Sequence, residues 1–283
     1  MKIGYSSRWL FVDDKEMNIF EELKYASSLG FEVFGLNLDR KQNRRLKNDD
    51  LIKLKKLAVN YGMKIIVRSP HHLNTSINSK ELIKSVRENI RIAKLLGSDR
   101  LMIHAGHMLE ELELDFQTSK SYKGKKRSDF RISQNRIQKR FEQLISNLKK
   151  IVSLGRQSGV KIVLENSGEY YQFGSNIVEY YKILKEVRGL KSSISTGHAN
   201  ISGNNVYEYI SKCMTEIINL DLHDNHGEKD EHLPLGEGNI DFKSILLKLK
   251  SREDLTLLID TYKNDFIERS LSNLRGILKS INS

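Results

Sequence analysis

Short apolar runs alternate with longer segments of helical periodicity along the whole chain. The short runs are rich in β-branched and aliphatic residues, which is typical of strands buried on both faces of a parallel sheet. They lie at 2–6, 31–37, 63–69, 100–106, 160–166, 190–195, 217–223 and 255–260. The segments that follow them carry apolar residues at the i, i+3, i+4 spacing of a helix with one buried face. They lie at 15–29, 48–60, 79–96, 134–158, 175–188, 203–213, 241–250 and 265–281.

This alternation of strand and helix predicts one closed (β/α)₈ barrel, a TIM barrel, that spans residues 1–283 as a single domain. A doubly wound open sheet is the alternative. Its usual mark is a glycine-rich fingerprint after the first strand, and here that position reads Tyr5, Ser6, Ser7, Arg8 and Trp9. The closed barrel is therefore the better prediction.

Glycines stand just before several of the predicted strands. We expect each of them to end the preceding helix in the left-handed conformation that glycine adopts without strain. They are Gly30, Gly62, Gly97, Gly159 and Gly189.

One segment breaks the alternation. Residues 110–133 are charged and weakly periodic, and they separate the fourth predicted strand from its helix. On a barrel they form an insertion over the end where active sites lie. The segment fits either a functional loop or a disordered basic one.

The composition bears on the cellular location of the protein and on the kind of molecule that it binds. Hydrophobic residues make up 39% of the chain, which is enough for a large core, and the formal net charge is +11. That charge allows a polyanionic partner such as DNA, although lysines spread over most predicted helices are more typical of a solvated surface. Cys213 is the single cysteine, so we expect no internal disulfide and a cytoplasmic location. We expect no membrane span and no export signal, because the N-terminus and the rest of the sequence lack the long apolar runs that these require.

The histidines follow a common rule. All of them stand at or just after the C-terminal end of a predicted strand, where the loops of a barrel converge on one mouth. They are His71, His72, His104, His107, His198, His223, His226 and His232. A single histidine there is usually a hydrogen-bonded structural residue, but so many together indicate a site. His72, His107 and His226 are the weakest candidates, as hydrogen-bonding or solvent-facing residues.

Acidic residues accompany the histidines at the strand ends. Glu165 and Asp260 end two predicted strands, and Asp230 and His232 form a D-x-H pair in the stretch 220–241. This stretch is either a wet, charged loop or one wall of a metal site. Imidazole and carboxylate together are the ligand set of Zn²⁺, Mn²⁺ or Fe²⁺, so we interpret the stretch as a ligand loop.

The ordered set of these motifs resembles the xylose isomerase-like barrel superfamily, which holds endonuclease IV and many sugar or sugar-phosphate isomerases and epimerases. The resemblance runs through nearly the whole chain. It is most specific in SPHHLN, MIHAGH, VLENSG, STGHAN, LHDNHGEKDEHLPLGEGNID and LLID.

The resemblance implies a divalent metal site of one to three ions, zinc or manganese. In the endonuclease IV-like arrangement, His71, His104 and Glu165 would hold the first ion. The second would lie on Glu165, His223 and Asp260, and the third on His198, Asp230 and His232. Two positions depart from the family pattern, because Ser195 replaces an aspartate and Asp260 replaces a glutamate. Both changes weaken the second position.

Three functions follow from the resemblance. In a sugar or sugar-phosphate isomerase or epimerase, Glu165 and Asp260 would shuttle a proton next to a carbonyl, and His198 and His232 would bind substrate hydroxyls. This is the function we expect. The first alternative is an endonuclease IV-like enzyme that hydrolyses DNA at abasic sites, with Arg44 and Arg45 in the loop 39–48 that would contact DNA. The second is a barrel that keeps the site for binding only.

Overall fold

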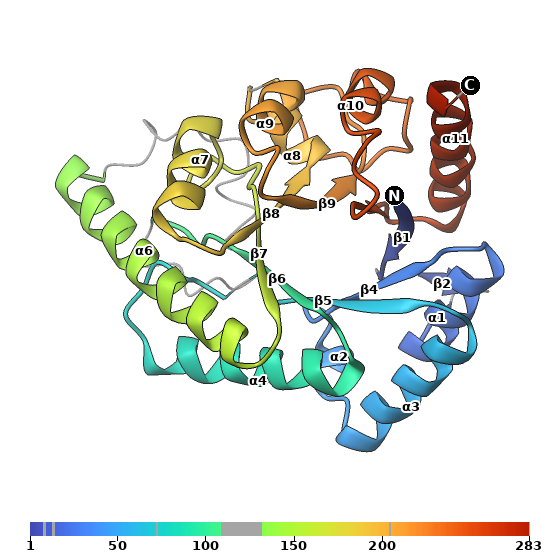
Figure 1. Ribbon diagram of the computed structural model, residues 1–283, viewed down its shortest axis with the longest axis horizontal. Helices are drawn as coiled ribbons and strands as arrows, with labels where there is room; N and C mark the ends of the chain where they lie inside the picture. Colours follow the sequence, from blue (N-terminus) through green and yellow to red (C-terminus); the bar gives the residue numbers. More distant parts are fainter. Residues whose placement is uncertain (8–9, 13–14, 72, 109–131, 204, 283) are drawn as a thin grey trace.

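Parallel strands close into a barrel with helices around it (Figure 1). The computed structural model describes residues 1–7, 10–12, 15–71, 73–108, 132–203 and 205–282. Within these ranges the barrel order is β1-β10-β9-β8-β7-β6-β5-β4, and β1 closes the ring by pairing with both β10 and β4. The strands are β1 Lys2–Ser6, β4 Val33–Asn37, β5 Lys64–Arg68, β6 Arg100–His104, β7 Lys161–Glu165, β8 Lys191–Ser195, β9 Ile217–Leu222 and β10 Thr256–Ile259. The predicted (β/α)₈ fold is confirmed, and each predicted run contains one of these strands.

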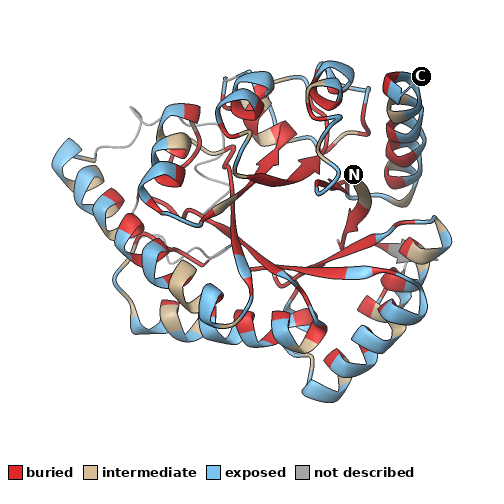
Figure 2. Ribbon diagram, viewed as in Figure 1, coloured by how far each residue is buried: buried red, intermediate tan, exposed pale blue. Residues whose placement is uncertain are grey.

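The helices cover the outside of the barrel, with their buried residues toward the barrel and their exposed residues on the outside (Figure 2). They are α1 Ile19–Ser28, α2 Lys41–Arg44, α3 Asn48–Asn60, α4 Lys80–Leu96, α6 Gln134–Gln157, α7 Ile177–Glu186, α8 Thr196–Ile201, α9 Val206–Lys212, α10 Phe242–Lys248 and α11 Asn264–Asn282. No helix among the described residues combines the length and the apolar character needed to cross a membrane.

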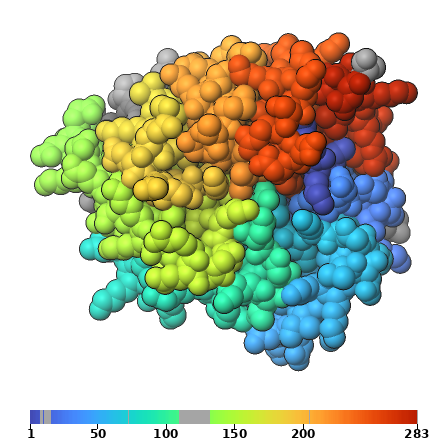
Figure 3. All heavy atoms as spheres, viewed as in Figure 1, coloured from blue at the N-terminus to red at the C-terminus, as the bar shows by residue number. Residues whose placement is uncertain are grey.

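The barrel interior changes character along its axis. Its lower part is an apolar layer of Val33, Ile66, Met102, Val163, Ile218 and Leu258. On the face shown in Figure 3, side chains close over the centre, as expected of a packed core rather than a pore. At the other end six of the eight barrel strands finish on polar residues: Ser6, Asn37, Arg68, His104, Glu165 and Ser195. Polar and titratable side chains therefore gather at the end of the barrel where the strands have their C-terminal residues.

The glycine prediction holds. All five predicted cap glycines have positive φ, and Gly97 ends α4 in the left-handed conformation with φ 72°. Asp241 caps α10, because its side chain accepts a hydrogen bond from the backbone of Ser244. Helix caps of this kind can be predicted from sequence because they depend only on residues that are neighbours in the chain.

Two local predictions were wrong. The helix predicted from residue 15 begins at Ile19, because Asn18 caps it and residues 15–16 form β3, which pairs with β2 (Phe11–Val12). The segment between the predicted strand 190–195 and the predicted helix 203–213 had no helix assigned to it, but it forms helix α8, which contains His198. The predicted insertion at 110–133 lies almost wholly outside the described residues.

Candidate metal centre

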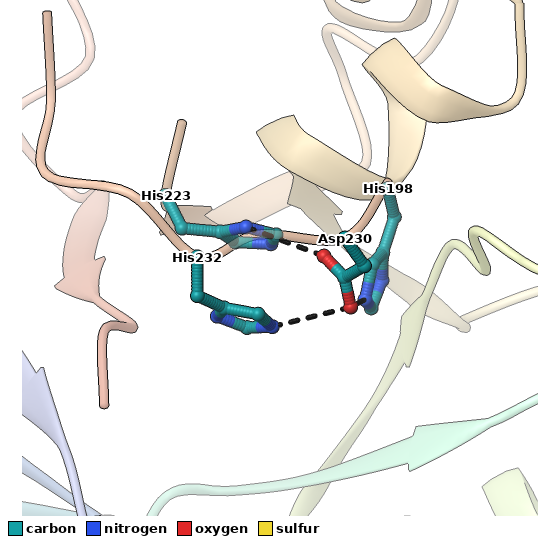
Figure 4. A group of neighbouring side chains, drawn as sticks. All are labelled: His198, His223, Asp230 and His232. Carbon is teal, nitrogen blue, oxygen red and sulfur yellow. Dashed lines mark ion pairs between the residues drawn. The ribbon is translucent and has the colours of Figure 1, made fainter. Parts of the chain in front are cut away.

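Four side chains converge at the mouth, beyond β8 and β9. His198 lies in α8, His223 follows β9, and Asp230 and His232 belong to the loop that leads to α10. One ligand atom of each lies within 4.8 Å of the others. Figure 4 shows the carboxylate of Asp230 between the imidazole rings. One of its oxygens is 3.2 Å from His232 Nε2 and 3.6 Å from His198 Nε2, and the other is 3.6 Å from His223 Nδ1.

The second nitrogen of each imidazole is held by another group. His198 Nδ1 is 3.1 Å from the backbone oxygen of Asn166, and His232 Nδ1 contacts the backbone oxygen of Asp260. A carbonyl oxygen only accepts, so both rings donate from Nδ1 and direct Nε2 toward Asp230. His223 Nε2 is 2.9 Å from the hydroxyl of Ser195, which leaves Nδ1 to face Asp230. Such outer contacts are the usual way in which proteins orient metal-binding histidines.

Two buried atoms in this cluster lack hydrogen-bond partners among the described residues. They are His223 Nδ1 and Asp230 Oδ1. Buried polar atoms are nearly always paired, so two orphans that face each other indicate a missing partner. Three imidazole nitrogens and a carboxylate suit a divalent ion such as Zn²⁺ or Mn²⁺. The residues present therefore fit a cation, which would lie on His198, His223, Asp230 and His232.

The electrostatics of the cluster point the same way. Burial lowers the pKa of His198, but the carboxylates of Asp230 and Glu165 outweigh burial and raise this pKa to about 9. Burial and the neighbouring His232 hold the pKa of His223 well below its usual value. Burial raises the pKa of Asp230, yet His232 and His198 outweigh it and hold this pKa well below its usual value. An anionic carboxylate among imidazoles thus attracts positive charge to this point.

The loop that carries Asp230 and His232 is fixed by Asp224. One carboxylate oxygen of Asp224 accepts hydrogen bonds from the backbone N–H groups of Gly236 and Gly238, at 2.9 and 3.0 Å, and the other from Ile240 at 3.2 Å. The ring of His232 stacks on that of His223 at 3.8 Å between centroids. The carboxylate of Asp224 therefore holds the loop backbone in place.

A small polar cavity opens beside the cluster. Its volume is about 90 Å³. It is lined by Asn37, Asp39, Arg68, Ser69, His71, His104, Glu165, His198, Asp230, His232 and Tyr262. Glu165 connects the cavity to the cluster, because its Oε1 is 3.6 Å from His198 Nδ1. That oxygen has no hydrogen-bond partner among the described residues.

The sequence of this chain matches a known family of barrels. The family model for xylose isomerase-like TIM barrels matches residues 23–278. The chain belongs to this family.

Individual relatives of this xylose isomerase-like barrel agree with the assignment. The uncharacterized protein MJ1311 of Methanocaldococcus jannaschii is 30% identical over 208 residues, which are 70% of this chain and 64% of that protein. A D-tagatose 3-epimerase-like protein has a TM-score of 0.81 and 24% identity, with 100% of this chain and 98% of that one covered. The D-psicose 3-epimerase of Clostridium cellulolyticum H10 has a TM-score of 0.74 at 12% identity, with 99% of each chain covered. At these identities the two structures establish the shared barrel fold.

The sequence analysis of this xylose isomerase-like barrel missed a buried cationic side chain, that of Arg68. Arg68 ends β5, and its guanidinium lies 2.8 Å from Glu165, 2.5 Å from Asp221 and 3.4 Å from Asp260. Asp260 was predicted as a metal ligand and second proton carrier. It lies beside Arg68 and is not among the cavity-lining residues. The only sequence signal for this cluster was an arginine as the last residue of a buried strand.

The other predicted ligands, His71 and His104, also line the cavity. His104 Nε2 is 3.9 Å from Glu165 Oε2, and the rings of His71 and His104 are 3.8 Å apart. His71 is half-exposed, and its backbone N–H donates to Asp39. The role of His71 and His104 as ligands stays a prediction, since their ligand atoms do not belong to the four-residue cluster.

The remaining predicted site residues that the structure describes lie outside the four-residue cluster and are not among the residues that line the cavity. Arg44 donates hydrogen bonds to the backbone oxygens of Leu38 and Asp39, and Arg45 is exposed. His107 is buried against Asn74, and His226 pairs with Glu231 at the surface. His72 lies outside the described residues. Substrate or DNA contacts by Arg44 and Arg45 stay a prediction.

Gly197 is a position where only glycine fits. A Cβ there would overlap the imidazole of His223, although the backbone conformation is compatible with any residue. We expect Gly197→Ala to displace the ring, to cost about 1–3 kcal/mol of stability and to weaken metal binding. Chemical denaturation and metal titration measure both. Gly276→Ala in α11 is the control, because nothing lies within 4 Å of the added carbon. A variant Gly197→Ala with unchanged metal affinity would contradict the assigned role of His223.

Ser195 has a role different from the one expected at its position. It stands where the family pattern has an acidic ligand, and its hydroxyl instead contacts His223 Nε2. We expect Ser195→Ala to lower metal affinity by about 10–100-fold, the usual effect of removing a group that orients a ligand. Isothermal titration with Zn²⁺ measures it, and Ser211→Ala on the exposed face of α9 is the control. Equal affinities in the two variants would mean that Ser195 does not orient the ring.

Proposed function

We propose that this protein is a divalent-metal-dependent sugar isomerase or epimerase that moves a proton next to a carbonyl group. The observation that carries the proposal is the juxtaposition of the four-ligand cluster with Glu165, 3.6 Å from His198, at the edge of one polar cavity. Membership of the xylose isomerase-like family and the likeness to sugar 3-epimerases support it.

Glu165 is the residue that we assign to the proton transfer. Arg68 holds its Oε2, while Oε1 is buried and has no hydrogen-bond partner among the described residues. A fixed carboxylate with one unengaged oxygen is suited to take a proton from a carbon placed against it. Asp260 was the expected partner on the opposite face. Its place beside Arg68, away from the cavity lining, makes Glu165 the better supported base.

A metal ion would complement the base by stabilising negative charge on the substrate. His198, His223, Asp230 and His232 would hold the ion, whose positive charge stabilises the negative charge that develops on the substrate oxygens. The cavity adds hydrogen-bonding groups from Asn37, Ser69 and Tyr262, which suit hydroxyls. A polyhydroxylated ligand such as a sugar needs such hydrogen-bond donors and acceptors.

The charge of the cavity favours an unphosphorylated sugar. Its lining carries the carboxylates of Asp39, Glu165 and Asp230 against two cationic groups, the guanidinium of Arg68 and the imidazole of His198, whose pKa is raised to about 9. A phosphate group would add negative charge to a site that is already negative before a metal ion binds. The same reasoning weighs against the cleavage of DNA phosphodiesters, as does the engagement of Glu165 and Asp260 by Arg68. We therefore place the nuclease second.

The test is proton exchange between sugar and solvent. The protein, loaded with Mn²⁺ or Zn²⁺, is incubated in heavy water with unphosphorylated aldoses and ketoses and, in parallel, with their phosphates. NMR then shows which carbon gains deuterium. We expect exchange next to the carbonyl of at least one neutral sugar, abolished by a chelator. Exchange in the phosphates alone would refute the choice of a neutral substrate. No exchange in either set, with cleavage of a DNA duplex carrying an abasic site, would favour the nuclease, and no reaction at all would favour a binding-only barrel.

A further inference from the structure

Arg68 reaches from β5 to carboxylates on the opposite wall of the barrel. Its partners come from three different segments: Glu165 ends β7, Asp221 lies in β9 and Asp260 follows β10. The side chains of all four residues are at most 5% exposed. One guanidinium thus bridges three buried carboxylates directly beside the proposed metal centre.

We propose that the guanidinium of Arg68 is a resident cation in the place of the second metal ion implied for this barrel mouth. The protein would then bind one divalent ion, on His198, His223, Asp230 and His232. The inference rests on the metal centre of the proposed function and adds its stoichiometry and the role of Arg68.

The residues expected to share a second ion are divided between two partners. The resemblance to the family implies Glu165, His223 and Asp260 around that ion. In the structure, Glu165 and Asp260 contact Arg68, whereas His223 turns Nδ1 to Asp230 and Nε2 to Ser195. Among the described residues, the group of side chains that could hold an ion contains His223 but neither Glu165 nor Asp260.

Asp221 completes the cage around the guanidinium. One of its oxygens contacts Arg68, and the other accepts hydrogen bonds from Ser193 Oγ at 2.6 Å and Asn219 Nδ2 at 3.3 Å. Its carboxylate is fully buried and saturated with donors, which is how a protein keeps an ion pair in place without water. Arg68 thus meets three carboxylates with a single positive charge. The cage therefore holds more negative charge than one guanidinium neutralises.

A guanidinium in the place of the second ion also accounts for the two departures from the family pattern, Ser195 and Asp260. Ser195 removes one carboxylate from the position of the second ion, and its hydroxyl orients His223 toward the first. The shorter side chain of Asp260 lies 3.4 Å from the guanidinium. Fixed charge at Arg68 also positions Glu165, because it holds Oε2 and leaves Oε1 directed toward His198.

The test counts metal ions in the wild-type protein and in two variants. Each is saturated with Mn²⁺, freed of excess ion by gel filtration and analysed for metal and protein content. We expect one ion per chain in the wild type, two in Arg68→Ala, which uncovers three carboxylates, and one in Arg68→Lys, which keeps a cation. Two or more ions in the wild type, or only one in a folded Arg68→Ala, would overturn the inference.

A double variant separates the two positions and guards against a folding artefact. His198→Ala alone removes a ligand of the first site, and we expect it to retain no ion through gel filtration. His198→Ala combined with Arg68→Ala should retain one, and added Mn²⁺ should raise its melting temperature more than that of His198→Ala. Equal metal content and equal shifts in the two proteins would refute a hidden second position. Because no sugar enters these measurements, the inference stands or falls separately from the isomerase reaction.

Discussion

Replacing Glu165 by glutamine is expected to slow proton exchange into the sugar by about 10²–10⁴-fold, the usual contribution of a positioned base. Glutamine keeps the shape and still accepts a hydrogen bond from Arg68, but it cannot take a proton. The measurement is the rate of deuterium incorporation under conditions where the wild type exchanges. Because the buried Oε1 lacks a hydrogen-bond partner among the described residues, we expect little change in the fold.

The metal content of Glu165→Gln decides between two roles of this residue. If Glu165 bridges two ions, as the family resemblance implies, the variant should lose metal. If it acts as a base beside a single ion, metal content should equal that of the wild type. Glu186→Gln, an exposed acid at the end of α7, serves as the control for exchange. A Glu165→Gln enzyme that exchanges protons at the wild-type rate would remove Glu165 from the mechanism.

Removal of one imidazole from the four-ligand cluster is expected to weaken metal binding by at least about 100-fold, because losing a ligand costs more than losing a group that orients one. His198→Ala is the best variant, since His198 is slightly exposed and lies in the short helix α8, where alanine is favourable. Isothermal titration with Zn²⁺ gives the affinity, and melting with and without Zn²⁺ gives the linked stabilisation.

His226→Ala is the matched control for this variant. His226 belongs to the same loop as Asp230 and His232 but lies at the surface and pairs with Glu231. We expect this variant to bind Zn²⁺ as the wild type does. If His198→Ala and His226→Ala bind equally well, the convergence of ligand atoms at the mouth is not a metal site.

The position of the site was predictable because the rule behind it is simple. In a parallel barrel all strands run the same way, so residues at their C-terminal ends share one mouth. The sequence places Glu165, His198, His223, Asp230 and His232 at or after such ends, and the structure brings them together. The fold followed from the same local signals, because strand and helix periodicity and glycine caps depend on near neighbours.

The partners within the mouth were not predictable in the same way. The ligand sets inferred from family resemblance assigned Asp260 and Glu165 to a shared metal ion, and the structure gives both to Arg68. Arg68 is separated from its three acidic partners by 97, 153 and 192 positions in the chain. Local patterns carry no information on contacts at such distances.

The sequence by itself therefore determined the barrel, its polar mouth and the supply of imidazoles and carboxylates there. Only the tertiary structure decided which carboxylate meets which cation, and which nitrogen of His198, His223 and His232 faces Asp230. Closure of the barrel sets the height at which each strand ends and the direction of each side chain. Differences of a few ångströms in that arrangement separate a metal ligand from the partner of a buried arginine.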